Sequence, residues 1–162
     1  MLNPQLDRRG ELIHLLTTEG LPRRHVERLL DAAAGFAQED AAVANASTAT
    51  PATTSGTLAA SSAAPLDLPL YLGVPADDAE LRRAYASAGQ RLGLRPIPLG
   101  DDLPAGNIPA PAAGLPPGIL VLRHAASGAA VSAAAAAPSG LRILNAGDGI
   151  HADPLPALAR VA

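Results

Sequence analysis

Residues 118–147, GILVLRHAASGAAVSAAAAAPSGLRILNAG, hold the clearest succession of secondary-structure signals in the chain. GILVLRH at 118–124 is apolar almost throughout, as strands buried on both faces of a parallel sheet are. The alanine-rich run at 126–137 has high helix propensity, and the Pro-Ser-Gly that follows should stop the helix. LRILNAG at 141–147 then returns to a strand. The stretch predicts a strand–helix–strand unit, which makes two neighbouring strands parallel.

The same alternation is visible upstream of this unit. Residues 66–74, LDLPLYLGV, predict a strand whose proline suits an edge or an irregular start. Residues 75–93, PADDAELRRAYASAGQRLG, predict a helix, and residues 94–99, LRPIPL, a second proline-interrupted strand. The proline- and glycine-rich residues 100–118 are expected to be loop. The predicted fold class is therefore α/β, a small parallel sheet of about four strands flanked by helices.

The helix expected at 75–93 carries signals at both of its ends. Asp77 is placed to cap it, with Glu80 three residues later as in a capping box, and Gly93 follows the last turn. Apolar residues recur along it at helical spacing, which predicts one buried stripe. That stripe consists of Leu81, Tyr85, Ala88 and Leu92.

The N-terminal part of the chain has a different character. Residues 21–36 predict a helix, and the segment after it is rich in Ala, Ser and Thr and lacks periodicity. We expect three regions on this basis: an N-terminal helical segment at 1–37, a linker or loop at 38–66, and an α/β domain at 67–162.

Composition excludes several classes of function. The net charge of −3 and pI near 5.7 argue against nucleic acid as a partner, because nucleic-acid binding needs a basic face. The absence of cysteine excludes disulfides and thiol chemistry. The N-terminus resembles neither a signal peptide nor a membrane anchor, so we expect a cytoplasmic protein that does not bind membranes. No cofactor motif is recognised, and no cofactor is expected.

Ligands of open parallel sheets bind beyond the carboxyl ends of the strands. Those ends here carry PADDAE at 75–80, RHAASGAA at 123–130 and NAGDGIHADP at 145–154. The last of these is a glycine-rich turn followed by the opening of a helix, with Asp153 as its cap. These three segments are the candidate site.

Several segments together resemble the aspartate carbamoyltransferase family, specifically its N-terminal, carbamoyl-phosphate-binding domain. VLRHAASGAA at 121–130 is similar to the family's Arg-His-Pro-x-x-Gly-Ala-Ala turn, and LNAGDGIHADPLPAL at 144–158 to its Asn-Ala-Gly-Asp-Gly signature. The opening segment NPQLD and RLG at 91–93 add further matches. The resemblance implies half of a transcarbamoylase, without the aspartate-binding domain. The family transfers a carbamoyl group from carbamoyl phosphate to aspartate, an early step of pyrimidine synthesis.

The family's phosphate motif, Ser-Thr-Arg-Thr-Arg, should fall at residues 78–82, where this chain has DAELR. Only Arg82 matches it, at a position that is mainly structural in the family. Arg123 matches the family's carbamoyl-phosphate arginine. These two arginines are the ligand-binding positions that the resemblance carries over. No catalytic residue and no metal ligand are expected.

Other features of this sequence oppose the family's chemistry. Asp77, Asp78 and Glu80 place three carboxylates on the first turn of a helix, where they should repel a dianionic phosphate. The chain contains no lysine at all, although a lysine-bearing loop serves the family's site. In the last signature the family's histidine and glutamine align with Asp153 and Pro156, neither of which can donate a hydrogen bond from its side chain to an oxyanion.

The sequence therefore predicts a catalytically inactive, transcarbamoylase-like protein. We expect it to act as an accessory or regulatory homologue, either as a homo-oligomer (a trimer) or in association with a full-length transcarbamoylase. Two alternatives remain open at this point: a residual carbamoyltransferase that works with a second chain, and a decaying gene product.

Individual site residues also have simpler explanations. For Arg123 a solvated or helix-paired arginine at a strand end is favoured over an anion ligand, and capping accounts for the acidic helix start. His124, Asp148, His151 and Asp153 suggest a metal site only weakly, because capping and the turn itself account for the two aspartates.

Overall fold

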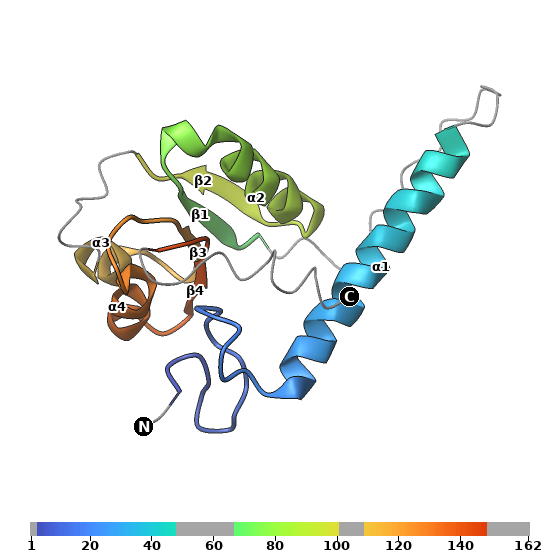
Figure 1. Ribbon diagram of the computed structural model, residues 1–162. Helices are drawn as coiled ribbons and strands as arrows, with labels where there is room; N and C mark the ends of the chain where they lie inside the picture. Colours follow the sequence, from blue (N-terminus) through green and yellow to red (C-terminus); the bar gives the residue numbers. More distant parts are fainter. Residues whose placement is uncertain (1–2, 48–66, 101–108, 149–162) are drawn as a thin grey trace.

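The computed structural model describes residues 3–47, 67–100 and 109–148. These residues form a four-stranded sheet with helices on both of its faces, and a long N-terminal helix that extends away from the sheet (Figure 1). In chain order the elements are α1 (Arg23–Ser47), β1 (Pro69–Gly73), the 3-10 turn η1 (Ala76–Asp78), α2 (Ala79–Arg91), β2 (Arg95–Pro98), α3 (Pro109–Gly114), β3 (Gly118–Leu122), α4 (Ala129–Ala136) and β4 (Leu141–Asn145).

The sheet has the order β2-β1-β3-β4, and all of its strand pairs are parallel. From β1 the chain moves outward through α2 to β2, and then crosses back to β3 on the other side of β1. Because parallel crossovers are right-handed, this reversal places α2 on one face and α4 on the other (Figure 1). The α/β fold class and the four parallel strands are confirmed.

Alternate residues of each strand enter two separate hydrophobic clusters. Tyr71 and Leu120 face α4, whereas Leu70, Leu72 and Val121 face α2. This alternation follows from the period of two along a strand. The cluster on the α4 side is built largely from alanine: Ala129, Ala130, Ala133 and Ala134 are buried there.

The segment before α1 packs beside β4. The N–H of Leu15 donates to the carbonyl of Ile143 (2.9 Å), and the N–H of Asn145 donates to the carbonyl of Leu15 (2.9 Å). Gln5, 1% exposed, accepts the N–H groups of Leu16 (2.7 Å) and Thr17 (2.9 Å) through Oε1. The N-terminal segment is thus joined to the sheet by buried hydrogen bonds, which are costly to lose.

Helix boundaries differ from the sequence prediction in two places. α1 runs on to Ser47, so residues 38–47, which we expected in the linker, are helical. A short helix, α3, lies inside the region expected to be loop. Alanine explains the extension of α1, since residues 38–47 are rich in this strong helix former and contain no glycine or proline. α3 begins at Pro109, and proline is well suited to the first position of a helix. Residues 48–66, and the helix expected after Asp153, lie outside the described residues.

The end of α2 agrees with the sequence. Gly93 follows the helix with φ 71°, and its N–H donates to the carbonyl of Gln90 (3.0 Å). A left-handed residue of this kind is the usual helix stop, and glycine adopts it without steric cost. No helix among the described residues is long and apolar enough to cross a membrane.

Candidate functional site

A crevice is expected outside the carboxyl ends of β1 and β3, because the strand order reverses between these two strands. The backbone continues to pair beyond both strands at this edge. The N–H of Arg123 donates to the carbonyl of Gly73 (2.9 Å), and the N–H of His124 donates to the carbonyl of Gly147 (3.0 Å). The described parts of the three strand-end segments named from sequence, residues 75–80, 123–130 and 145–148, therefore meet at one edge of the sheet.

Arg123 holds the central position at this edge. Its Nη1 donates to the carbonyl of Ala146 (3.1 Å), and its Nε forms a close ion pair with Oδ2 of Asp78. The side chains of Arg123 and Asp78 are 40% and 37% exposed, so each is more than half removed from solvent. The helix-paired interpretation of Arg123 is the one that the geometry supports.

Arg82 is used differently. Its Nε and Nη2 both donate to the carbonyl of Val74, at 3.1 and 2.6 Å. The guanidinium thereby links α2 to the residue that follows β1, and fixes the turn that leads into η1. Of the two arginines carried over by resemblance, Arg123 lies at the carboxyl ends of the strands and pairs with Asp78, whereas these contacts of Arg82 are with backbone alone.

The start of α2 corrects the capping prediction. The N-cap residue of α2 is Asp78 and that of η1 is Pro75, and neither side chain makes a capping hydrogen bond. Asp78 turns toward Arg123 instead. Asp77 and Glu80 are exposed. The start of α2 therefore differs from a simple cluster of three carboxylates, because the carboxylate of Asp78 is paired with Arg123.

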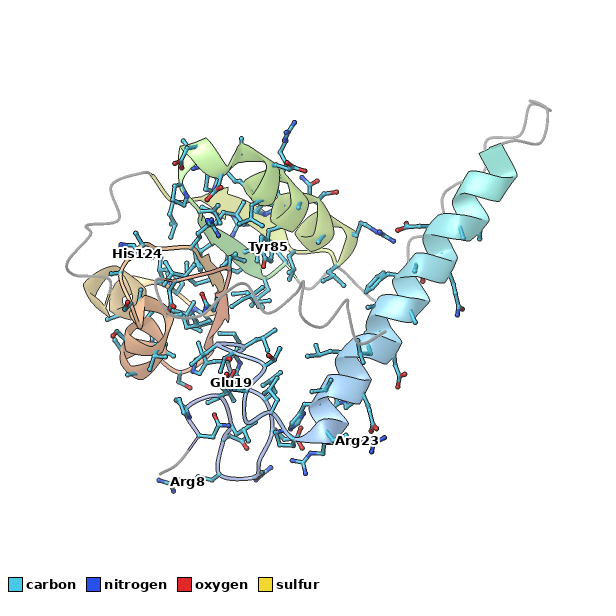
Figure 2. All side chains as sticks on the ribbon, in the orientation of Figure 1. Arg8, Glu19, Arg23, Tyr85 and His124 are labelled. Atoms are coloured by element: carbon cyan, nitrogen blue, oxygen red, sulfur yellow. The ribbon has the colours of Figure 1, made fainter. Side chains whose placement is uncertain are left out.

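Further polar side chains follow β3 and β4. Nδ1 of His124 accepts the N–H of Ala126 (2.9 Å) in the turn between β3 and α4 (Figure 2). Oδ1 of Asn145 accepts the N–H of Gly147 (2.9 Å), and its Nδ2 donates to the carbonyl of Leu16 (2.9 Å). These contacts shape the turn and leave Asn145 buried in a structural role.

Within the described ranges, no group of three or more His, Asp or Glu side chains is arranged to hold a metal ion. His124 and Asp148 are described, but His151, Asp153 and Pro156 lie outside those ranges, so their positions relative to the crevice stay predictions.

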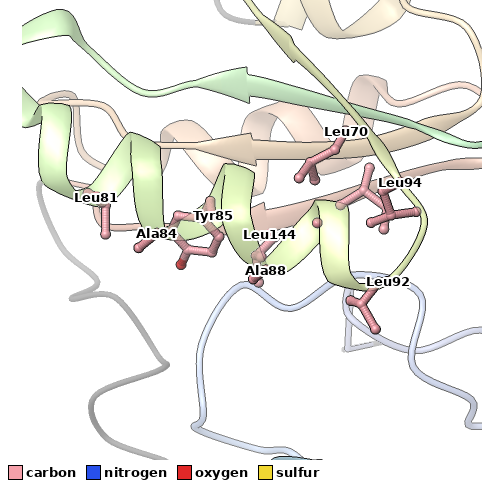
Figure 3. Close-up of a pocket in the computed structure, with 10 residues that line it drawn as sticks. Leu70, Leu81, Ala84, Tyr85, Ala88, Leu92, Leu94 and Leu144 are labelled. Carbon is pink, nitrogen blue, oxygen red and sulfur yellow. The ribbon is translucent and has the colours of Figure 1, made fainter. Parts of the chain in front are cut away.

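A second hollow lies on the α2 face of the sheet. It has a volume of about 400 Å³ and an almost wholly apolar lining, and its floor includes residues from three strands (Figure 3). α2 packs chiefly on β1 and β2, which leaves the hollow beside it. The lining residues are Leu70, Leu81, Ala84, Tyr85, Ala88, Gly89, Leu92, Leu94, Ile119 and Leu144.

This apolar pocket corrects the prediction of a buried stripe on α2. Tyr85 is buried at 7% exposure, but Leu81 is only half-buried, Ala88 is exposed and Leu92 is 49% exposed. The helical spacing identified the correct face of α2. Sequence alone did not show that this face would remain partly open, because that depends on which elements lie opposite it.

The fold places this chain in the class of open parallel α/β domains, in which ligands bind where the strand order reverses. No family model matches the chain. Among solved structures it is similar to the catalytic subunit of M. jannaschii aspartate transcarbamoylase, with a TM-score of 0.57 and 22% sequence identity. The similarity covers 92% of this chain and 45% of the other, so this chain spans less than half the length of that subunit. The expected transcarbamoylase half-domain fold is confirmed.

Proposed function

We propose that this protein is a non-catalytic relative of aspartate transcarbamoylase that acts as an accessory subunit in pyrimidine synthesis. The observation that carries the proposal is the ion pair of Arg123 with Asp78 beyond the carboxyl ends of β1 and β3. Transfer of a carbamoyl group requires cationic and hydrogen-bond donors that face the phosphate and the developing oxyanion. Here the arginine is already engaged by a carboxylate of the same chain.

Two further features support the loss of catalysis. The chain has no lysine, and its 12 basic residues are all arginine. The structure describes two arginines near the carboxyl ends of β1 and β3. These are Arg82 and Arg123, and both donate hydrogen bonds to backbone carbonyls. A doubly charged substrate would also approach the exposed carboxylates of Asp77 and Glu80, which oppose its binding.

The partner in this proposal is a transcarbamoylase catalytic chain. The similarity covers 45% of the M. jannaschii catalytic subunit, so more than half of that subunit is not matched by this chain. The chain also presents the apolar pocket beside α2, with Leu92 half-exposed at its rim. Apolar surface of this kind is stabilised when another protein covers it. A homo-oligomer, such as a trimer, would use the same surface and is a competing outcome.

The test combines an assay with a binding measurement. The purified chain is incubated with carbamoyl phosphate and aspartate, alone and with the transcarbamoylase catalytic chain of the same cell. We expect no carbamoyl aspartate from the chain alone, and a mixed complex by size-exclusion chromatography with light scattering. Formation of carbamoyl aspartate by the chain alone, or no mixed complex at micromolar concentrations, would contradict the proposal.

A second candidate function is residual transferase activity that needs another chain to complete the site. The retention of Arg123 at the crevice favours it. This function predicts that carbamoyl aspartate forms only when this chain is mixed with a catalytically dead variant of the partner. The amount of product should then rise with the concentration of this chain.

A further inference from the structure

We propose that the carboxylate of Asp78 is a built-in occupant of an oxyanion site, so that this crevice is closed by the chain itself. The class of ligand displaced is a small phosphate-like oxyanion. The inference rests on the proposed function and deepens it, because it names the atom group that blocks the site. The site thus keeps the guanidinium of Arg123, and the carboxylate of Asp78 takes the place of the oxyanion.

The topology places the ion pair where a ligand would lie. β1 and β3 are neighbours, and the chain leaves them toward opposite edges of the sheet. Backbone diverges at such a point, and the space beyond the strand ends accepts ligands. Asp78 follows β1 and Arg123 follows β3, so the pair closes this space from its two sides.

The guanidinium of Arg123 is held in a fixed position. The hydrogen bond from Nη1 to the carbonyl of Ala146 (3.1 Å) anchors it against the end of β4, and its backbone N–H is bonded to Gly73 (2.9 Å). An arginine anchored in this way presents its other N–H groups in one direction, as anion-binding arginines do. In this structure that direction leads to Oδ2 of Asp78.

The position of Asp78 is informative because its side chain has another option. As the N-cap of α2 it stands where an aspartate normally accepts an N–H of the first turn, yet no such bond is made. The carboxylate is directed to Arg123, beside the positive end of the dipole of a 13-residue helix. One negative group therefore satisfies two positive features that would otherwise act on a bound oxyanion.

Asp77 provides a natural comparison. It lies on the same turn, carries the same charge and is exposed. Removing either carboxylate changes the net charge equally, but only removal of Asp78 frees the guanidinium of Arg123. A difference between the two variants thus separates occupation of the site from general repulsion.

The experiment measures binding of inorganic phosphate by calorimetry, at low ionic strength, to the wild type and to D78A, D77A and the double variant D78A/R123Q. We expect D78A to bind phosphate at least about tenfold more tightly than the wild type, a difference of about 1.4 kcal/mol. D77A should resemble the wild type, and R123Q should cancel the gain. D78N, which keeps the size of the side chain, should show the same gain, and serves if D78A fails to fold by circular dichroism.

Several results would overturn the inference. Phosphate binding to D78A and D78N that is no tighter than binding to the wild type would show that no oxyanion site lies beneath the carboxylate. If D77A gained as much phosphate affinity as D78A, the effect would come from net charge alone. If D78A/R123Q kept the gain in affinity, the phosphate would bind somewhere other than at Arg123. The proposed function is tested separately, by product formation and complex formation in the wild type, so the two proposals can fail independently.

Discussion

At the scale of single residues, His14 shows how burial alters a side chain. It is 7% exposed, and its Nδ1 accepts the N–H of Ile143 (3.0 Å), so the imidazole is part of the hydrogen bonding beside β4. Burial, and to a smaller extent the Arg142 guanidinium, lower the pKa of His14 below its usual value of 6.5. Both causes disfavour the imidazolium, which would lose hydration and face a like charge.

This shift predicts a loss of stability in mild acid. Because the pKa of His14 is lower in the folded than in the unfolded state, its contribution to stability is complete above about pH 6.5 and declines as the pH falls toward the folded pKa. Thermal melts from pH 7.5 down to 5 should show a falling melting temperature. His14→Asn keeps an acceptor for Ile143 and should flatten this dependence. An unchanged dependence in His14→Asn would show that the imidazole is not its source.

At the scale of elements, the sheet depends on close approach between β1 and β3. A Cβ added at Gly118 would lie 2.7 Å from the carbonyl oxygen of Pro69, and 2.9 Å from the rings of Pro69 and Tyr71. The carbonyl belongs to the backbone of the paired strand and cannot move aside without disturbing the sheet. The glycine at the start of β3 is therefore required by packing, whereas the sequence showed only that it lies at the boundary between a loop and a strand.

We expect Gly118→Ala to lower the free energy of unfolding by about 1–3 kcal/mol, the usual cost of overpacking. Gly35→Ala is the matched control. Gly35 lies in α1, and a Cβ there would meet nothing within 4 Å, so this change should be neutral or stabilise the helix by up to about 1 kcal/mol. Denaturant unfolding of both variants measures the difference. Equal stability of the two variants would show that β1 and β3 separate at no cost.

At the scale of the whole molecule, the two faces of the sheet are covered unequally. The N-terminal segment, α3 and α4 contribute to the cluster on one face, whereas α2 is the main cover of the other among the described elements. The open apolar pocket results from this inequality (Figure 3). Association with another chain is the expected consequence.

Leu92→Glu should weaken that association by at least about tenfold, because it places a charge at the rim of an apolar contact. The native fold should tolerate this change, since the side chain is 49% exposed. Val131→Glu is the matched control, as Val131 is the other large exposed apolar residue of the described part and lies on α4. Titration with the transcarbamoylase catalytic chain checks both variants. An equal effect of the two substitutions would exclude the α2 face as the contact.

The sequence by itself determined the strand–helix–strand succession, the end of α2 at Gly93 and the edge where the candidate site lies. These features depend on interactions between residues near in sequence: hydrophobic period, propensity and glycine at positive φ. The sequence prediction made α1 too short, because it relied on an apolar stripe. The alanine-rich end of this helix has no such stripe, but alanine favours helix on its own.

Only the tertiary structure decided the partner of Asp78 and the exposure of Leu92. The carboxylate of an aspartate at a helix start can either cap the helix or form an ion pair. Which of the two forms here depends on the position of Arg123 at the end of β3. The spacing of a stripe likewise gives a helix its apolar face, but not the element that lies against it. Contacts between distant segments are set by the geometry of the whole sheet, and that geometry here pairs the carboxylate of one strand end with the arginine of another.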